Sequence, residues 1–272
     1  MSEIDVNGVS LYHEAHGEGP GVILVHGSWS DADGWARVVP GLAGRCRVVA
    51  YDRRGHSRSE DPPGQGSVHQ DVADLAALIE ELGLAPAFVC GNSFGALIAL
   101  RLAVARPDLV RGLAVHEPPA LGLLRDDPEL AALSRQFVER NEPVRVLLEA
   151  GESAAAAELF VDTVAFGPDS WPRVPAPLRH TFIRNAPSYL DELRDPEAFD
   201  LDLAALARYR DPVLLTRSDN SPPLFEPVLD RIALTLPQAE SHLYRGAGHV
   251  PHVTEPAEYV ALVLPRALAG TV

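Results

Sequence analysis

The chain has 272 residues, of which 46% are hydrophobic and 22% charged, so it is long enough to bury a large core. Its formal net charge is −15 at pH 7, and a surface this acidic repels phosphate backbones and anionic lipid headgroups. We therefore expect neither nucleic acid nor a membrane as a partner. With two cysteines, and no signal-peptide pattern at the start, we expect a soluble, cytoplasmic protein without a disulfide framework.

The first quarter of the chain alternates short apolar runs with turns. Asn7-Gly8 lies between two alternating segments and predicts a β-hairpin. Residues 22–25 and 48–51 are continuous apolar runs without alternation. Such runs are typical of strands that are buried on both faces of a parallel sheet.

A helix and a third buried strand follow. Ser67 and Gln70 have the spacing of a capping box, and apolar residues then recur at helical spacing until Gly83. Residues 87–90 are the next apolar run, and a second apolar helix is predicted over residues 96–105. Between this strand and this helix lies the most informative turn of the chain.

The segment 118–199 has a different character, because it shows helical patterns and no evident strand. The candidate helices are residues 129–138, 144–150 and 154–164. We interpret the segment as an inserted helical cap on a core formed by residues 1–117 and 200–272.

Strands resume at residues 212–216 and 241–244, and a final amphipathic helix is predicted over residues 256–268. Strands that alternate with helices predict an α/β fold with a mostly parallel sheet covered on both faces. Functional groups in such sheets lie at the carboxyl ends of the strands. Catalytic or binding residues are therefore expected directly after each apolar run.

Residues 91–95, Gly-Asn-Ser-Phe-Gly, match the G-x-S-x-G pattern. This pattern forms a sharp strand-to-helix turn that lifts the serine hydroxyl out of the sheet. Here it follows a buried strand and precedes an apolar helix, which is the context that the turn requires. The sequence therefore predicts Ser93 as a nucleophile.

Several motifs in order resemble the α/β-hydrolase superfamily over nearly the whole chain. They are His26-Gly27 after a strand, residues 52–59, the turn at Ser93 and the Gly-Ala-Gly-His segment 246–249. The resemblance implies an eight-stranded, mostly parallel sheet with a helical cap. It also implies a hydrolase that needs no cofactor and acts on a small-molecule substrate.

The resemblance places the catalytic base at His249, in a glycine-rich loop after the last strand, with His252 as the nearby rival. It places the acid after the preceding strand, which indicates Asp219. Arg217 stands there where many relatives have glycine. Glu117 is the alternative acid, because some relatives carry the acid after the strand that follows the nucleophile.

An acyl-transfer transition state needs N–H donors for its oxyanion. By resemblance, these donors are the backbone N–H groups of Ser28 and Phe94. Trp29 takes the place of Ser28 if the loop register differs by one residue. No metal site is expected, since no histidine pair in the sequence has a convincing carboxylate or cysteine partner.

Serine at the nucleophile position argues against dehalogenation and epoxide opening, for which relatives use aspartate. We expect hydrolysis of a carboxylic ester, thioester or lactone of a medium-sized, largely uncharged substrate. The residues expected to line its pocket are Trp29, Phe160, Phe166, Trp171 and Phe182. The alternatives are a C–C bond hydrolase or lyase on the same fold, or a ligand-binding receptor without catalysis.

Overall fold

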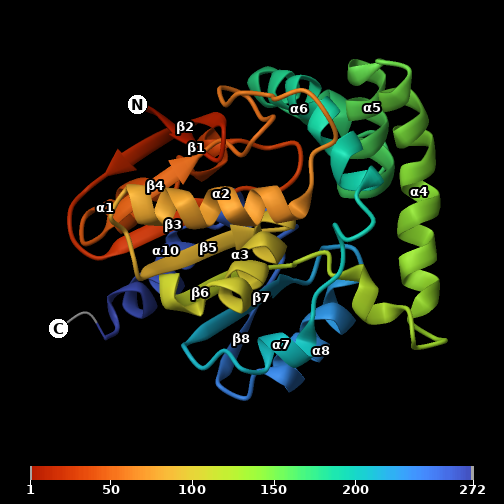
Figure 1. Cartoon of the computed structure of the whole chain (residues 1–272). Coiled ribbons are helices and arrows are strands. Elements are labelled where there is room, and N and C mark those ends of the chain that lie inside the picture. The colour runs from red at the N-terminus through yellow and green to blue at the C-terminus, as the bar shows by residue number, and fades with distance from the viewer. Residues whose placement is uncertain (1, 271–272) are drawn as a thin grey trace.

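The computed structural model describes residues 2–270, in which eight strands form one sheet in the order β1-β2-β4-β3-β5-β6-β7-β8 (Figure 1). The strands are β1 Ser2–Val6, β2 Val9–His16, β3 Gly21–Val25, β4 Arg47–Tyr51, β5 Ala87–Asn92, β6 Val110–His116, β7 Val213–Ser218 and β8 Ala239–Tyr244. Strand β2 pairs antiparallel with β1 and β4, and all other pairs are parallel. The mostly parallel eight-stranded sheet predicted from the sequence is confirmed.

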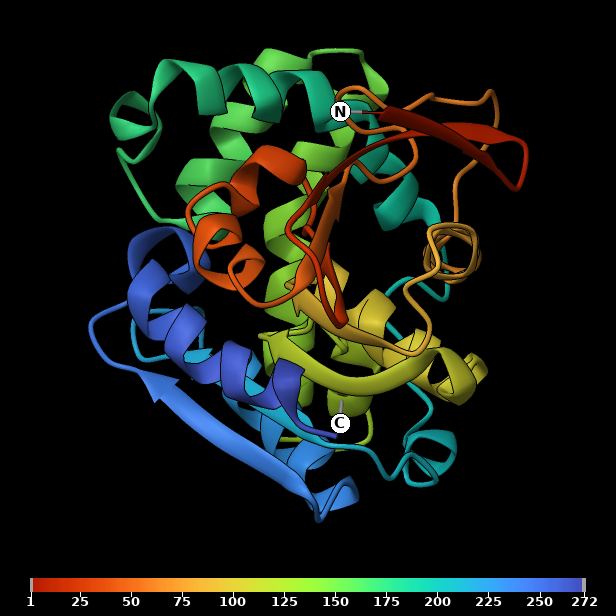
Figure 2. The same cartoon turned by 90° about the vertical axis from the view of Figure 1, so that its left-hand side faces the viewer.

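Helices cover both faces of this sheet. They are α1 Val39–Ala43, α2 Val68–Glu81, α3 Phe94–Ala105, α4 Ala131–Glu149, α5 Ser153–Phe160, α6 Ala176–Arg194, α7 Leu203–Leu206, α8 Phe225–Thr235, α9 Pro251–Thr254 and α10 Pro256–Leu268. In β3, Ile23 and Val25 pack among residues of α2, α3 and α8, whereas Val22 and Leu24 pack among residues of α1 and α10. Figure 2 shows the two helical layers on opposite sides of the sheet. Burial on both faces explains why the strands read as continuous apolar runs.

Local signals in the sequence set several element boundaries. Asn7 and Gly8 both have positive φ, 48° and 76°, and join β1 to β2 as a tight hairpin. Ser67 accepts a hydrogen bond from the backbone N–H of Gln70, and the Gln70 side chain accepts one from the backbone N–H of Ser67. This capping box fixes the start of α2.

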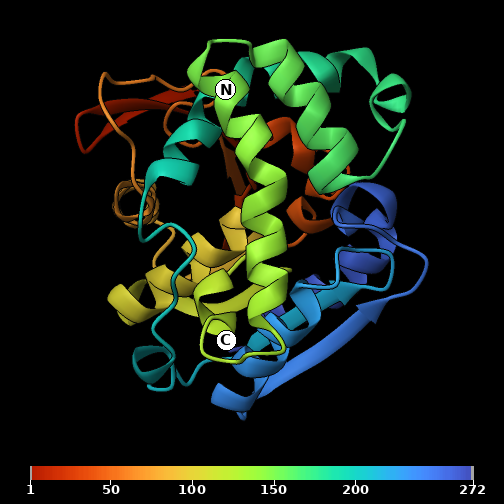
Figure 3. The ribbon, with the colours of Figure 1, turned by 90° about the vertical axis from the view of Figure 1, so that its right-hand side faces the viewer.

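The chain between β6 and β7 carries α4, α5 and α6, which pack on one another around their own apolar cluster (Figure 3). Two helices were expected over residues 129–138 and 144–150, but they form the continuous helix α4 with Pro143 inside it. Val144 and Leu148 are buried in the apolar cluster, and this packing holds the helix together across the proline. In residues 2–270, no helix has the length and apolarity that crossing a bilayer would require.

Candidate active site

Ser93 lies on the turn between β5 and α3, with φ 54° and ψ −123°. A non-glycine residue rarely adopts this backbone conformation, and such strain is concentrated at functional turns. The backbone N–H of Ser93 donates to the carbonyl of His116, 2.8 Å away on β6. Gly95 is needed for close approach, because a Cβ there would come within 2.2 Å of the carbonyl oxygen of Val25. The predicted elbow geometry is therefore present.

His249 is paired with Glu117. The Nδ1 atom of His249 lies 2.5 Å from Oε2 of Glu117, directly beyond the carboxyl end of β6. Oε1 of Glu117 accepts a hydrogen bond from the backbone N–H of Ser218 at 2.7 Å, at the end of the neighbouring strand β7. Glu117 is completely buried and has a φ of 47°. Its carboxylate is thus fixed from two sides and orients the imidazole.

The surroundings of Glu117 keep it ionised. Burial by itself raises the pKa of the carboxyl, but hydrogen bonding from His116 and His249 outweighs burial and holds the pKa well below its usual range. The Nε2 atom of His116 lies 3.3 Å from the same carboxylate oxygen that His249 contacts. A buried carboxylate in this state stabilises an imidazolium that forms beside it.

Asp219 does not pair with His249, so the favoured acid assignment is corrected to the alternative. Strand β7 continues to Ser218, so that Asp219 falls in an exposed turn. There its Oδ1 accepts a hydrogen bond from the backbone N–H of Gly246 at 2.6 Å. Asp219 therefore shapes the loop before His249, whereas Glu117 reaches the imidazole. The signal for Glu117 was its position directly after an apolar strand.

Two aromatic contacts distinguish His249 from its rival His252. The ring of Phe225 stacks on His249 with centroids 4.7 Å apart and leaves the imidazole 16% exposed. His252 is buried against Trp35 at 4.2 Å, and burial lowers its pKa to about 3. His252 is therefore neutral and lacks the carboxylate partner that a triad base has.

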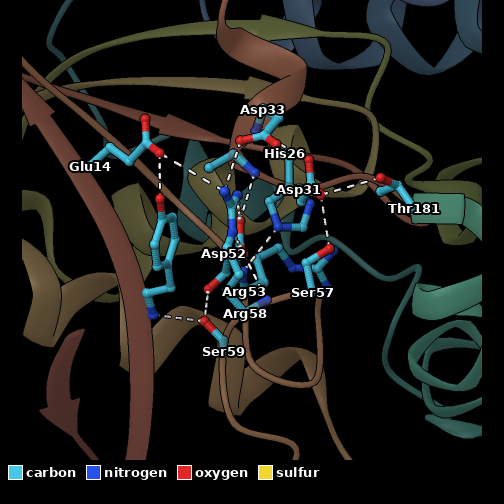
Figure 4. Close-up of polar contacts among 12 residues, drawn as sticks. Glu14, His26, Asp31, Asp33, Asp52, Arg53, Ser57, Arg58, Ser59 and Thr181 are labelled. Atoms are coloured by element: carbon cyan, nitrogen blue, oxygen red, sulfur yellow. Dashed lines mark hydrogen bonds and ion pairs between the residues drawn. The ribbon is translucent and has the colours of Figure 1, made fainter. Parts of the chain in front are cut away.

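The His26-Gly27 segment brings a second loop against Ser93. The Nδ1 atom of His26 hydrogen-bonds to the carbonyl of Gly27 at 2.8 Å, and Nε2 accepts from the backbone N–H of Arg53 at 2.9 Å (Figure 4). A Cβ at Gly27 would come within 2.9 Å of the Cβ of Ser93. The following residue, Ser28, thus lies beside the elbow. We call residues 26–30 the oxyanion loop, after the role that the sequence predicts for the backbone N–H of Ser28.

Polar contacts from the turn after β4 support this region (Figure 4). Asp52 accepts hydrogen bonds from the backbone N–H of Ala32 at 2.8 Å and from the guanidinium of Arg58 at 2.7 Å. The hydroxyl of Ser57 donates to Asp31 at 2.8 Å. Residues 52–59, which carried part of the family resemblance, thus hydrogen-bond to Asp31 and Ala32, the two residues that follow the oxyanion loop.

A cavity of about 200 Å³ opens beside Ser93 and His249, which both line it together with Ser28. Most of its other walls are apolar, and the aromatic residues among them include Phe137, Phe160, Phe166, Phe182, Phe199 and Phe225.

Three of the five expected pocket residues, Phe160, Phe166 and Phe182, line this cavity. Trp29 and Trp171 are not among its lining residues, and both are buried in the apolar cluster formed around α4, α5 and α6. Sequence reasoning missed Phe137, which lies on α4, Phe199, which lies at the end of the segment 118–199, and Phe225, which lies beyond that segment. Nothing in their local pattern distinguishes them from core residues.

Within residues 2–270, one group of side chains could offer three metal ligands, with atoms that lie within 4.8 Å of one another: His116, Glu117 and His249. A metal ion held by all three would compete for the Glu117 oxygen and the His249 nitrogen that already share a hydrogen bond. The arrangement fits a proton-transfer triad directly, with His116 as an additional neighbour of the acid.

Comparison with known proteins agrees with this geometry. A model of the alpha/beta hydrolase family matches residues 22–262. The chain belongs to the alpha/beta hydrolase family. It is 26% identical to an alpha/beta hydrolase from Sphaerobacter thermophilus, with a TM-score of 0.78 over 97% of this chain and 99% of the other.

Two curated relatives are similar over part of the chain. The uncharacterized hydrolase YraK of Bacillus subtilis is 35% identical over 165 residues, 56% of this chain and 59% of the relative. The putative carbamate hydrolase RutD of Azorhizobium caulinodans is 33% identical over 144 residues, 53% of this chain and 51% of the relative. The chain thus spans half to three fifths of the length of these curated relatives.

Proposed function

We propose that the protein is a serine hydrolase that cleaves a carboxylic ester, thioester or lactone through an acyl-enzyme. The observation that carries the proposal is the hydrogen bond between His249 and the buried carboxylate of Glu117, beside a strained serine elbow. Ser93 and His249 line the same cavity. A serine hydroxyl is a weak nucleophile until a neighbouring base removes its proton, and an oriented imidazole provides that base.

Each residue has one role in the proposed reaction. His249 takes the proton of Ser93 as the hydroxyl attacks the carbonyl carbon, and later gives that proton to the leaving group. Glu117 keeps the imidazole in the tautomer whose Nε2 accepts the proton. The backbone N–H groups of Ser28 and Phe94 stabilise the oxyanion, and Phe94 begins α3, where the first amides lack partners within the helix. Water then hydrolyses the acyl-enzyme.

The substrate is proposed to be medium-sized and largely uncharged. Aromatic rings dominate the cavity, so binding relies on burial of apolar surface rather than on ion pairing. We propose that residues 118–199 act as the cap that closes this cavity over the substrate. A carbamate is a further candidate for the scissile group, in view of the similarity to a putative carbamate hydrolase.

The test is covalent labelling with a fluorophosphonate, followed by turnover of p-nitrophenyl acetate, butyrate, octanoate and a p-nitrophenyl carbamate. The wild-type protein should label at Ser93 and hydrolyse at least one of these compounds. Ser93→Ala should abolish labelling and lower turnover by up to about a million-fold. Ser241→Ala, at an exposed serine on β8, is the matched control and should behave as the wild type. Full ester turnover by Ser93→Ala would disprove the proposal.

The same experiment separates the alternatives. Labelling at Ser93 without turnover of any of the four compounds would favour C–C bond cleavage or lyase chemistry. Binding of small apolar molecules without any labelling would favour a receptor.

A further inference from the structure

One face of the cap helix α6 follows the oxyanion loop residue by residue. The residues of α6 that make these contacts are spaced by four and three positions, so they lie on one side of the helix. Their contacts run antiparallel to the loop: Asn185 with Ser30, Tyr189 with Trp29, and Glu192 with Ser28. All three α6 residues are buried. The cap and the loop beside the nucleophile are thus joined through three consecutive loop residues.

Trp29 is the apolar part of this connection. Its side chain is completely buried, stacks on Phe160 with ring centroids 4.6 Å apart, and packs at a tilt of 46° against Tyr189 at 4.9 Å. It therefore belongs to the apolar cluster of the cap, although the loop that carries it extends from strand β3 of the core. Its φ of 66° is strained for a non-glycine residue, so packing against the cap compensates for the strain of the loop backbone.

Glu192 is the polar part, and hydrogen bonds from two different residues fix its position. The hydroxyl of Ser28 donates to one carboxylate oxygen of Glu192, and the guanidinium of Arg53 donates to the other at 2.9 Å. Arg53 is itself held by Asp71 on α2 at 3.0 and 3.1 Å. The backbone N–H of Arg53 also binds His26 at the start of the oxyanion loop. Arg53 therefore contacts both His26, at the start of the oxyanion loop, and Glu192, which binds Ser28.

We propose that Glu192 is a positioning residue for the oxyanion hole, through which the cap helix α6 sets the place of Ser28. The inference rests on the serine-hydrolase function proposed above. Because Ser28 supplies a backbone N–H to the oxyanion, a shift of the loop weakens a contact made fully only in the transition state. A displacement on the order of 1 Å in such a group costs up to about a hundredfold in rate. The cap then contributes to chemistry as well as to substrate binding.

The experiment uses Glu192→Gln, Ser28→Ala and the double variant in the full-length protein. Ser28 and Arg53 contact different carboxylate oxygens of Glu192, and glutamine replaces one of these oxygens with an NH₂ group that can only donate, so one of the two contacts is lost. Each single variant should lower kcat about tenfold and leave KM within about twofold. The double variant should be no slower than the slower single variant, because both changes remove the same contact. Glu158→Gln, at an exposed glutamate of α5 in the same cap, should leave kcat and KM unchanged.

A boronic acid that forms a tetrahedral adduct on Ser93 gives a second measurement. Its affinity should fall in the variants by the same factor as kcat/KM, since it places an oxygen in the oxyanion hole.

Three outcomes would each overturn the inference. They are a kcat at the wild-type value in the single variants, a loss confined to KM, and multiplicative effects on kcat in the double variant. If Glu192→Gln fails to fold, Ser28→Ala removes only a hydroxyl and decides the question. A wild-type protein that neither labels nor hydrolyses would remove the proposed function and, with it, this inference. Normal wild-type turnover with unaffected variants would remove the inference alone.

Discussion

His249 Nδ1 and Glu117 Oε2 lie 2.5 Å apart although the two residues are separated by 132 positions in the sequence. The carboxylate comes from the end of β6, and the imidazole comes from the loop after β8, with β7 between the two strands in the sheet. Ser218 at the end of β7 binds the other carboxylate oxygen. The acid is therefore held by the neighbouring strand rather than by the loop that carries Asp219.

Exchange of Glu117 for glutamine should lower kcat roughly a thousandfold or more, because an amide nitrogen facing His249 Nδ1 favours the wrong imidazole tautomer. Asp219→Asn is the matched change and should cost less than about tenfold, since the Asp219 carboxylate accepts from the backbone N–H of Gly246 and does not pair with His249. Steady-state turnover of the ester that the wild type prefers measures both. A larger loss at Asp219 would contradict the pairing with Glu117.

Phe166 should control the length of the acyl chain. It lines the cavity while remaining 43% exposed, so its removal takes away substrate contact without opening the core. Phe166→Ala should raise KM for p-nitrophenyl octanoate about fivefold, for a loss of about 1 kcal/mol of apolar contact, and leave acetate unchanged. Val138→Ala, at an exposed valine of α4, is the control. Equal effects on both esters would show that Phe166 does not contact the chain.

The free energy of unfolding should fall as the pH is lowered from 7 to 5, and protonation of His252 in the unfolded state should account for part of this decrease. Burial lowers the pKa of His26 and His252 to about 3, whereas an unfolded histidine titrates near 6.5. Between these values the unfolded state binds more protons, so the free energy of unfolding rises with pH through this window and falls on acidification.

The matching variant is His252→Phe, which keeps an aromatic ring against Trp35. This variant should lose up to about 2 kcal/mol less of its free energy of unfolding between pH 7 and pH 5 than the wild type does, as measured by urea unfolding at both pH values. His180→Gln, at an exposed histidine of α6, should leave the pH dependence as in the wild type. If the pH dependence of the free energy of unfolding is unchanged in His252→Phe, the imidazole of His252 binds a proton in the folded protein as readily as in the unfolded one.

Trp29 should matter for stability as much as any core residue. Trp29→Ala empties a completely buried aromatic site in the cap cluster and should cost about 3–5 kcal/mol in the free energy of unfolding. Leu234→Ala, at a residue that is 86% exposed on α8, should change stability by less than about 0.5 kcal/mol. Equal midpoints in urea for the two variants would refute the role of Trp29 in joining loop and cap.

The sequence by itself determined the features that depend on a few neighbouring residues. The turn at Asn7-Gly8 and the capping box at Ser67 form at the expected positions, and the final helix Pro256–Leu268 has the expected bounds. The strained elbow at Ser93 also follows from adjacent residues, because glycines on both sides permit the close approach that the turn needs. Backbone preferences of this kind act over a single turn, and so a linear pattern reveals them.

Only the tertiary structure decided which distant groups meet. Glu117 and Asp219 both follow apolar strands, and the choice between them depended on where β7 ends and on which side chain remains buried. Pro143 predicts an interruption of the helix, but burial of the neighbouring residues keeps α4 continuous. Trp29 was expected to line the pocket, whereas it packs in the apolar cluster of the cap helices. The Glu117–His249 pair and the place of Trp29 depend on contacts between segments more than a hundred residues apart, and the continuity of α4 depends on its packing against α5 and α6. The free energy of those contacts has no counterpart in the local sequence pattern.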